Sequence, residues 1–234
     1  MLLLNTLITS LAGELLADEN PTFYDPVDRQ LEGWSVAVDP RLLAEDNAKA
    51  ADAALAALAN HLQRVRYILP EDRVAQLQRV RIWIELDNAK LTSMQYHPNR
   101  KWLVDHGHDP RLTRHVHIPR AATLVERRTW AKHPYSVLHE LAHAYHDQVL
   151  SFDEPEILAA FQTVKKEGTY DKVLLFTGEK NVRHYALSNH LEYFAESSEA
   201  YLGVNDFYPF VRAELREHDP VMFSLMEKIW GEVR

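Results

Sequence analysis

Residues 136–149, SVLHELAHAYHDQV, constrain the fold and the chemistry of this chain more than any other stretch. Apolar residues recur along it at intervals of three and four, which is the pattern of an amphipathic helix. The stretch contains an HExxH motif made by His139, Glu140 and His143. On a helix, positions i and i+4 lie one turn apart on the same face, so both imidazoles can bind one ion. The motif therefore predicts a zinc site in which Glu140 activates water.

A catalytic zinc ion usually has three protein ligands, so the motif requires another ligand elsewhere in the chain. Residues 188–201, SNHLEYFAESSEAY, form a second helical pattern with Glu192, Glu196 and Glu199 at i, i+4 and i+7. Three carboxylates on one stripe repel one another unless a cation neutralises them. Because apolar residues border the stripe, we expect part of it to be buried. We predict that Glu192 is the third ligand and that Glu196 orients a ligand histidine; an exposed acidic face is the alternative.

At this point the chain resembles a known family. HExxH followed by the run Glu192-Tyr193-Phe194-Ala195-Glu196 is similar to the gluzincin metallopeptidases, and more narrowly to the catalytic domain of anthrax lethal factor and its bacterial relatives. In that family the glutamate that opens the run binds zinc, and a tyrosine seven residues earlier stabilises the transition state. Tyr185 stands at that distance here. The resemblance covers about residues 136–201, and the Ala-His-Ala at residues 142–144 departs from the Gly-His often seen in lethal factor without touching a ligand.

The resemblance implies an α+β, zincin-like fold with one Zn²⁺ per chain. We expect a small mixed sheet and a long helix in an N-terminal lobe, a helical C-terminal lobe, and the zinc-site helix between them. The implied function is hydrolysis of a peptide or protein substrate, with Glu140 as general base and Tyr185 as a donor to the oxyanion. Two alternatives stay open: an inactive, zinc-stabilised binding or scaffold domain, and a zinc hydrolase of a non-peptide amide.

The composition is ordinary for a soluble globular protein and limits the partners. The chain has 234 residues, of which 46% are hydrophobic, and a formal net charge of −8. Nucleic-acid binding without sequence preference needs a basic footprint, so the charge argues against it and mildly favours neutral or basic peptides. The chain has no cysteine, which excludes disulfides and cysteine-ligated zinc. No glycine-rich nucleotide motif and no GxSxG nucleophile motif is present.

The apolar run at residues 2–12 predicts either a cleaved export signal or an N-terminal helix packed on the domain. Small residues follow it as signal peptidase requires, but no basic residue precedes it and an asparagine interrupts it. The run is too short to span a membrane. We therefore divide the chain into this segment, residues 1–17, and one domain, residues 18–234, with lobes of about 18–149 and 150–234. Cleavage would make the protein extracytoplasmic, and an intact N-terminus would make it cytoplasmic.

Hydrophobic periodicity predicts strands before the motif and helices on both sides of it. Residues 19–29 are expected to be an extended lead-in. The predicted strands are residues 33–38, 80–86, 93–97 and 115–118, the last as an edge strand because Pro119 follows it, with a strand-like piece at 173–176. Apart from the zinc-site helix, the predicted helices are residues 44–68, 71–77, 121–132, 154–166, 187–202, 208–217 and 220–230, with a turn near 101–104.

The remaining histidines give weaker signals. His146 lies two turns after His139 and is expected to contact substrate or a group that supports the ligands, or to be a partly exposed histidine. His190 points away from Glu192 on its helix, so we expect no metal contact from it. A group of five histidines predicts either a second metal site or, more simply, a solvated histidine-rich rim: His97, His106, His108, His115 and His117.

Overall fold

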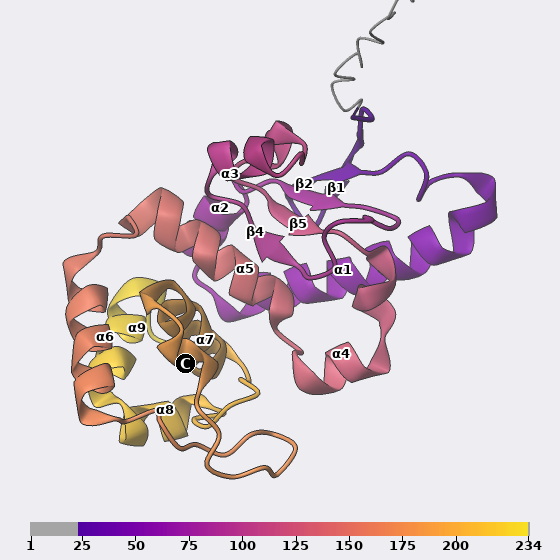
Figure 1. The fold of residues 1–234 in the computed structure, drawn as a ribbon. Helices are drawn as coiled ribbons and strands as arrows, with labels where there is room; N and C mark the ends of the chain where they lie inside the picture. The colour runs from indigo at the N-terminus through magenta and orange to yellow at the C-terminus, as the bar shows by residue number, and fades with distance from the viewer. Residues whose placement is uncertain (1–22, 234) are drawn as a thin grey trace, which may run out of the picture.

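The computed structural model describes residues 23–233, so the predicted signal peptide or N-terminal helix at residues 1–17 lies outside the described residues. The described chain has an α+β fold (Figure 1). A small mixed sheet and a long helix form its N-terminal half, helices form its C-terminal half, and the HExxH helix lies between them. This arrangement of sheet, HExxH helix and C-terminal helices is the one predicted from the sequence. Among the described residues, no helix is both long and apolar enough to cross a bilayer.

The sheet in the described residues has five strands in the order β1-β2-β3-β5-β4. β2, β3 and β5 run parallel, and β1 and β4 pair antiparallel with them at the two edges. The bounds are β1 (Val27–Leu31), β2 (Trp34–Val38), β3 (Ile82–Ile84), β4 (Gln95–Tyr96) and β5 (Val116–Ile118). The four predicted strands are confirmed, and β1 lies partly in the segment expected to be an extended lead-in.

One strand prediction is wrong in its place within the sheet. β5 is not an edge, because β3 pairs with one side of it and β4 with the other. Pro119 lies one residue beyond the strand, so its missing N–H removes no ladder bond from β5. The edge strand is β4, which is two residues long and follows a loop. The sequence predicts this strand at residues 93–97 but does not show with which strand it pairs.

The two faces of the sheet carry different side chains. Ile82, Ile84 and Val116 belong to the main core, whereas the intervening Trp83 belongs to a smaller outer cluster with Leu103. This alternation is the two-residue period of a strand. The main face is covered by α1 (Ala48–Ile68) and α5 (Ser136–Tyr145), with α2 (Glu71–Leu77) beside them, and the outer face by α3 (Arg100–Asp105).

The predicted helices are present, with changes in their bounds. Those expected from residues 44, 187 and 208 become α helices at Ala48, His190 and Arg212, and two other helices change more. The helix expected at residues 121–132 breaks at Glu126, whose backbone is extended, into a 3-10 turn, Ala121–Val125, and α4 (Arg127–Lys132). The HExxH helix widens after Tyr145 into a π-helical turn, His146–Leu150. The strand-like piece at 173–176 forms two isolated bridges, from Val173 to Val182 and from Leu175 to Phe207.

The C-terminal half packs around one buried helix, α7 (His190–Leu202). Every residue of α7 from Tyr193 onward is buried. Asn189 caps the helix, since its side chain accepts from the N–H groups of Leu191 and Glu192. This cap explains why α7 starts after residue 187. Three helices surround it and α5 packs along it: α6 (Pro155–Glu167), α8 (Arg212–His218) and α9 (Pro220–Trp230).

Candidate metal centre

The two motif histidines lie side by side on α5. His139 and His143 turn their Nε2 atoms toward each other at 3.1 Å. The helix is buried along its other side, where Val137, Leu138 and Leu141 enter the core. The imidazoles themselves keep a little exposure, 13% and 12%, so solvent can reach them. This is the arrangement expected from the i, i+4 spacing.

The first turn of α7 brings a carboxylate to the same point. Glu192 Oε2 lies 3.2 Å from Nε2 of His139 and 3.3 Å from Nε2 of His143. Burial opposes ionisation of Glu192, but hydrogen bonds from the two imidazoles outweigh it and lower the pKa of Glu192. The structure thus brings together the three residues that the sequence singled out as ligands.

These three atoms fit a zinc ion. Zinc bound to nitrogen and oxygen at the usual bond lengths in a tetrahedral site holds its ligand atoms roughly 3.3–3.4 Å apart. The observed separations are 3.1, 3.2 and 3.3 Å. Two imidazole nitrogens and a carboxylate oxygen that face one another at this distance repel unless a cation or a proton lies between them. Two nitrogens and one oxygen are also a donor set that zinc prefers.

Glu140 lies beside this group and is held by the sheet. The backbone N–H of Tyr96, in β4, donates to Glu140 Oε2 at 2.7 Å. Burial raises the pKa of Glu140, and electrostatic interactions with the two motif histidines and the hydrogen bond from Tyr96 oppose that shift. One carboxylate oxygen is therefore fixed by the edge strand, and the other is left for a water or a substrate proton. Sequence reasoning did not identify Tyr96, because its contribution comes from the backbone.

Tyr185 stands at the rim of the site. It begins a 3-10 turn, Tyr185–Leu187, and its side chain is 48% exposed. Burial and the charge of Glu192 raise the pKa of Tyr185, so the phenol remains protonated near pH 7. A protonated phenol within the field of Glu192 is suited to donate a hydrogen bond to a developing oxyanion.

A different glutamate from the expected one holds the first histidine. His139 Nδ1 lies 2.6 Å from Glu199 Oε1, whereas Glu196 Oε1 lies 3.7 Å from the same nitrogen. Glu199 is seven positions after Glu192, which places it almost directly above Glu192 on the helix. A carboxylate on the far nitrogen of a metal-binding imidazole fixes the tautomer and the ring orientation. The structure places Glu199, and not the predicted Glu196, at hydrogen-bond distance from Nδ1 of His139.

Glu196 lies deeper than Glu199. Burial and the charge of Glu199 raise the pKa of Glu196 well above its ordinary value. Its Oε2 lies 3.8 Å from Nδ1 of His184, and the buried Asp206 adds a further negative charge nearby. Asp206 is itself 3.6 Å from Lys132 and from His133. Asp206 could not be identified from the sequence, since it lies in a loop with no periodic pattern.

The structure separates His146 from the proposed ligands. His146 is fully buried, its ring packs against Phe152 and Phe194, and it begins the π-helical turn. Burial lowers the pKa of His146 to about 3, so it is neutral. As expected, His190 faces elsewhere, with Nε2 2.8 Å from the carbonyl oxygen of Phe152.

The histidine group at residues 97–117 is not a solvated rim. His97, His108 and His117 are buried on the outer face of the sheet. The side chain of Trp102 stacks with His97, His106 and His108. Within residues 23–233, the groups that could hold a metal are the ligand set above and His139 with Glu196 and Glu199. The prediction failed because the sequence did not show that α3 and the following loop cover this face.

No family model and no curated protein matches the chain. Among solved structures, it is similar to the Pro-Pro endopeptidase PPEP-2 from Paenibacillus alvei. The two are 18% identical with a TM-score of 0.41, over 82% of this chain and 95% of that chain. The functional proposal below therefore rests on the side chains of the site.

Proposed function

We propose that the protein is a zinc-dependent metallopeptidase. The observation that supports this most directly is the triangle of His139 Nε2, His143 Nε2 and Glu192 Oε2, with sides of 3.1–3.3 Å, beside the free oxygen of Glu140. These three residues would hold the ion. When bound, zinc supplies a Lewis acid that makes a water more acidic and polarises a carbonyl.

The residues of the chain supply the proton chemistry in this proposal. Glu140 takes a proton from the attacking water and later passes it to the leaving amine. Tyr185 donates a hydrogen bond to the oxygen of the carbonyl as negative charge develops on it. Glu199 keeps the imidazole of His139 in one tautomer through its 2.6 Å contact.

An extended peptide is the substrate class that best suits the site. The sheet edge beside Glu140 is β4, Gln95–Tyr96, and not the predicted edge strand at residues 115–118. Exposed strand edges bind extended backbones through main-chain hydrogen bonds. The order of the motif, Tyr185 and the EYFAE run supports the narrower assignment to peptidases that resemble the lethal-factor catalytic domain.

A peptide-library digest with metal analysis of the same preparation tests the proposal. We expect about one zinc per chain and cleavage of some library members, as a three-ligand site implies. Bound zinc with cleavage of acyl-amide compounds but no peptides would favour the non-peptide hydrolase. Bound zinc with no hydrolysis of either class would favour the scaffold domain.

Tyr185→Phe is expected to lower kcat on the order of 10²–10³-fold, the usual effect of removing one oxyanion donor. KM should change little, since the hydrogen bond strengthens only in the transition state. Zinc content should equal that of the wild type, because Tyr185 is not among the proposed ligands. Steady-state kinetics on a peptide from the library measures both constants. An unchanged kcat would remove Tyr185 from the mechanism.

A further inference from the structure

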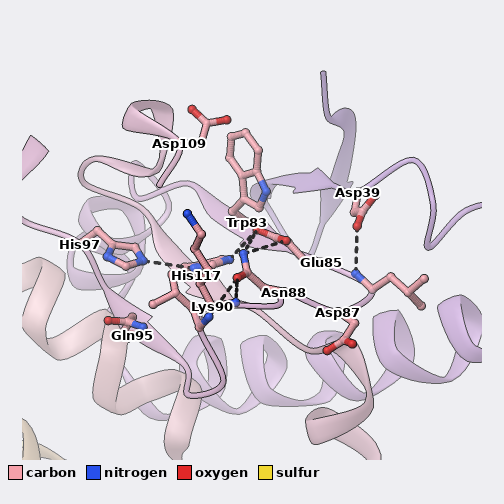
Figure 2. Close-up of polar contacts among 12 residues, drawn as sticks. Asp39, Trp83, Glu85, Asp87, Asn88, Lys90, Gln95, His97, Asp109 and His117 are labelled. Atoms are coloured by element: carbon pink, nitrogen blue, oxygen red, sulfur yellow. Dashed lines mark hydrogen bonds and ion pairs between the residues drawn. The ribbon is translucent and has the colours of Figure 1, made fainter. Parts of the chain in front are cut away.

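A hydrogen-bonded chain of buried side chains crosses the outer face of the sheet, opposite the candidate metal centre. Glu85 follows β3, His117 lies in β5, and His97 follows β4 (Figure 2). Glu85 Oε1 lies 2.9 Å from Nε2 of His117, and Nδ1 of His117 lies 3.1 Å from Nε2 of His97. The exposed fractions of the three residues are 6%, 0% and 3%. These hydrogen bonds thus link residues in or just after β3, β5 and β4, which are far apart in the sequence and meet only in the folded sheet.

When both rings are neutral, the protons along these hydrogen bonds have one order. Glu85 as a carboxylate can only accept, and it also accepts at 3.1 Å on each oxygen from Nδ2 of Asn88. Nε2 of His117 must therefore carry a proton, which leaves Nδ1 of a neutral His117 as an acceptor. Nε2 of His97 then donates to it. Burial lowers the pKa of His97 to about 3, so this ring is neutral near pH 7.

The edge strand has few other attachments to the sheet. β4 pairs only with β5, and the register covers Gln95 and Tyr96. The backbone of His97 adds an N–H bond to the His115 carbonyl at 3.2 Å and accepts one from Arg114 at 2.7 Å. The bond between the His97 and His117 rings adds a side-chain attachment on the outer face at the end of this strand. On the other face, the buried Tyr96 hydroxyl donates to Asp147 and accepts from Gln148.

The position of β4 matters because of the next residue along the chain. Tyr96 precedes His97 and donates its backbone N–H to Glu140 at 2.7 Å. Side chains alternate along a strand, so Tyr96 faces the main core while His97 faces outward. Any shift of His97 therefore moves the N–H that holds Glu140.

We propose that Glu85, His117 and His97 are positioning residues that hold β4 so that the Tyr96 N–H fixes the Glu140 carboxylate. This assignment rests on the proposed peptidase function for its catalytic consequence. Its structural consequence, the protection of the Tyr96 amide, does not depend on that function. The three residues touch neither the proposed ligands nor the attacking water, and they act through the edge strand.

The test compares four full-length, zinc-loaded variants by amide hydrogen exchange and by peptide kinetics. His97→Phe keeps a ring to stack on Trp102 but removes the donor to His117. His97→Gln restores a donor at about the reach of Nε2. Leu103→Ala, a buried position in the outer cluster, destabilises the same face without touching the chain of hydrogen bonds. Glu85→Gln keeps the size of the side chain but weakens the hydrogen bond to Nε2 of His117. It replaces His97→Phe in the test if that variant does not fold.

In His97→Phe we expect exchange of the Tyr96 amide to be faster by about tenfold, the factor that corresponds to one lost hydrogen bond. We expect kcat to fall ~10- to 100-fold with KM and zinc content unchanged, because a small misplacement of a catalytic group is costly. His97→Gln should recover most of the protection of the Tyr96 amide and most of kcat. Leu103→Ala should change neither the Tyr96 exchange rate nor kcat.

Two results would overturn the proposal. One is unchanged Tyr96 exchange in both His97→Phe and Glu85→Gln. The other is an equal effect in Leu103→Ala, which would indicate general loosening of the outer face. If the wild type cleaves no peptide, the peptidase function fails, while the exchange data still decide whether the chain holds β4.

Discussion

Glu140→Gln is expected to reduce peptide cleavage by the ~10²–10⁴-fold typical of losing a general base, or by more because the same group also serves as the acid. The amide cannot take a proton from water, although it keeps the size of the carboxylate. It can still accept from the Tyr96 N–H that now holds Glu140 at 2.7 Å, so the fold and the edge strand should be preserved. Zinc content should be unchanged, since Glu140 is not one of the three proposed ligands.

The measurement is peptide cleavage and metal content on the same preparation of the variant. Glu167→Gln is a matched control, because Glu167 is an exposed glutamate at the end of α6 and far along the chain from the motif. It should behave like the wild type. Undiminished cleavage by Glu140→Gln would contradict the mechanism and make the scaffold domain the better description.

Glu192→Ala is expected to lose bound zinc and, with it, activity. Removing an outer hydrogen-bond partner of a ligand typically costs about 10–100-fold in metal affinity, so removal of a direct ligand should cost more. The remaining pair, His139 and His143, leaves two ligands where a catalytic site normally has three. Competition with a chromogenic chelator measures the affinity directly.

Glu196→Gln is the control for the acidic stripe, because it removes a buried carboxyl that is 3.7 Å from His139 and not part of the triangle. It should retain about one zinc per chain, as expected for an intact three-ligand site. Full zinc retention in Glu192→Ala would instead assign the third ligand to Glu196 or Glu199, which with His139 form the second possible metal-binding group in the described residues.

Residues with strong local patterns could be predicted from sequence. The HExxH spacing alone determined that His139 and His143 share a helix face, because that depends only on helix geometry. The apolar border of the second stripe predicted that Glu192 would be partly buried beside them, and the structure has its carboxylate oxygen within 3.3 Å of both Nε2 atoms. The α+β layout could be predicted as well, because the two-residue period of strands and the 3.6-residue period of helices are both local patterns.

Features that depend on how elements pack against each other were not predictable. Glu196 and Glu199 lie on nearly the same stripe, and only the rotation of α7 against α5 decides that Glu199 contacts His139. The position of β5 inside the sheet depends on a two-residue strand, β4, that has no periodicity of its own. The burial of His117 depends on α3, whose covering of the outer face no local pattern indicates.

A zinc titration of chelator-stripped wild-type protein tests the central claim most directly. Bound zinc and cleavage of one library peptide are measured in the same samples as metal is added. We expect no cleavage before zinc is added, a rise in proportion to bound zinc, and a plateau at about one ion per chain, as a single three-ligand site requires. Full cleavage by the stripped protein, or saturation with zinc without any cleavage, would contradict the assignment of a zinc-dependent peptidase.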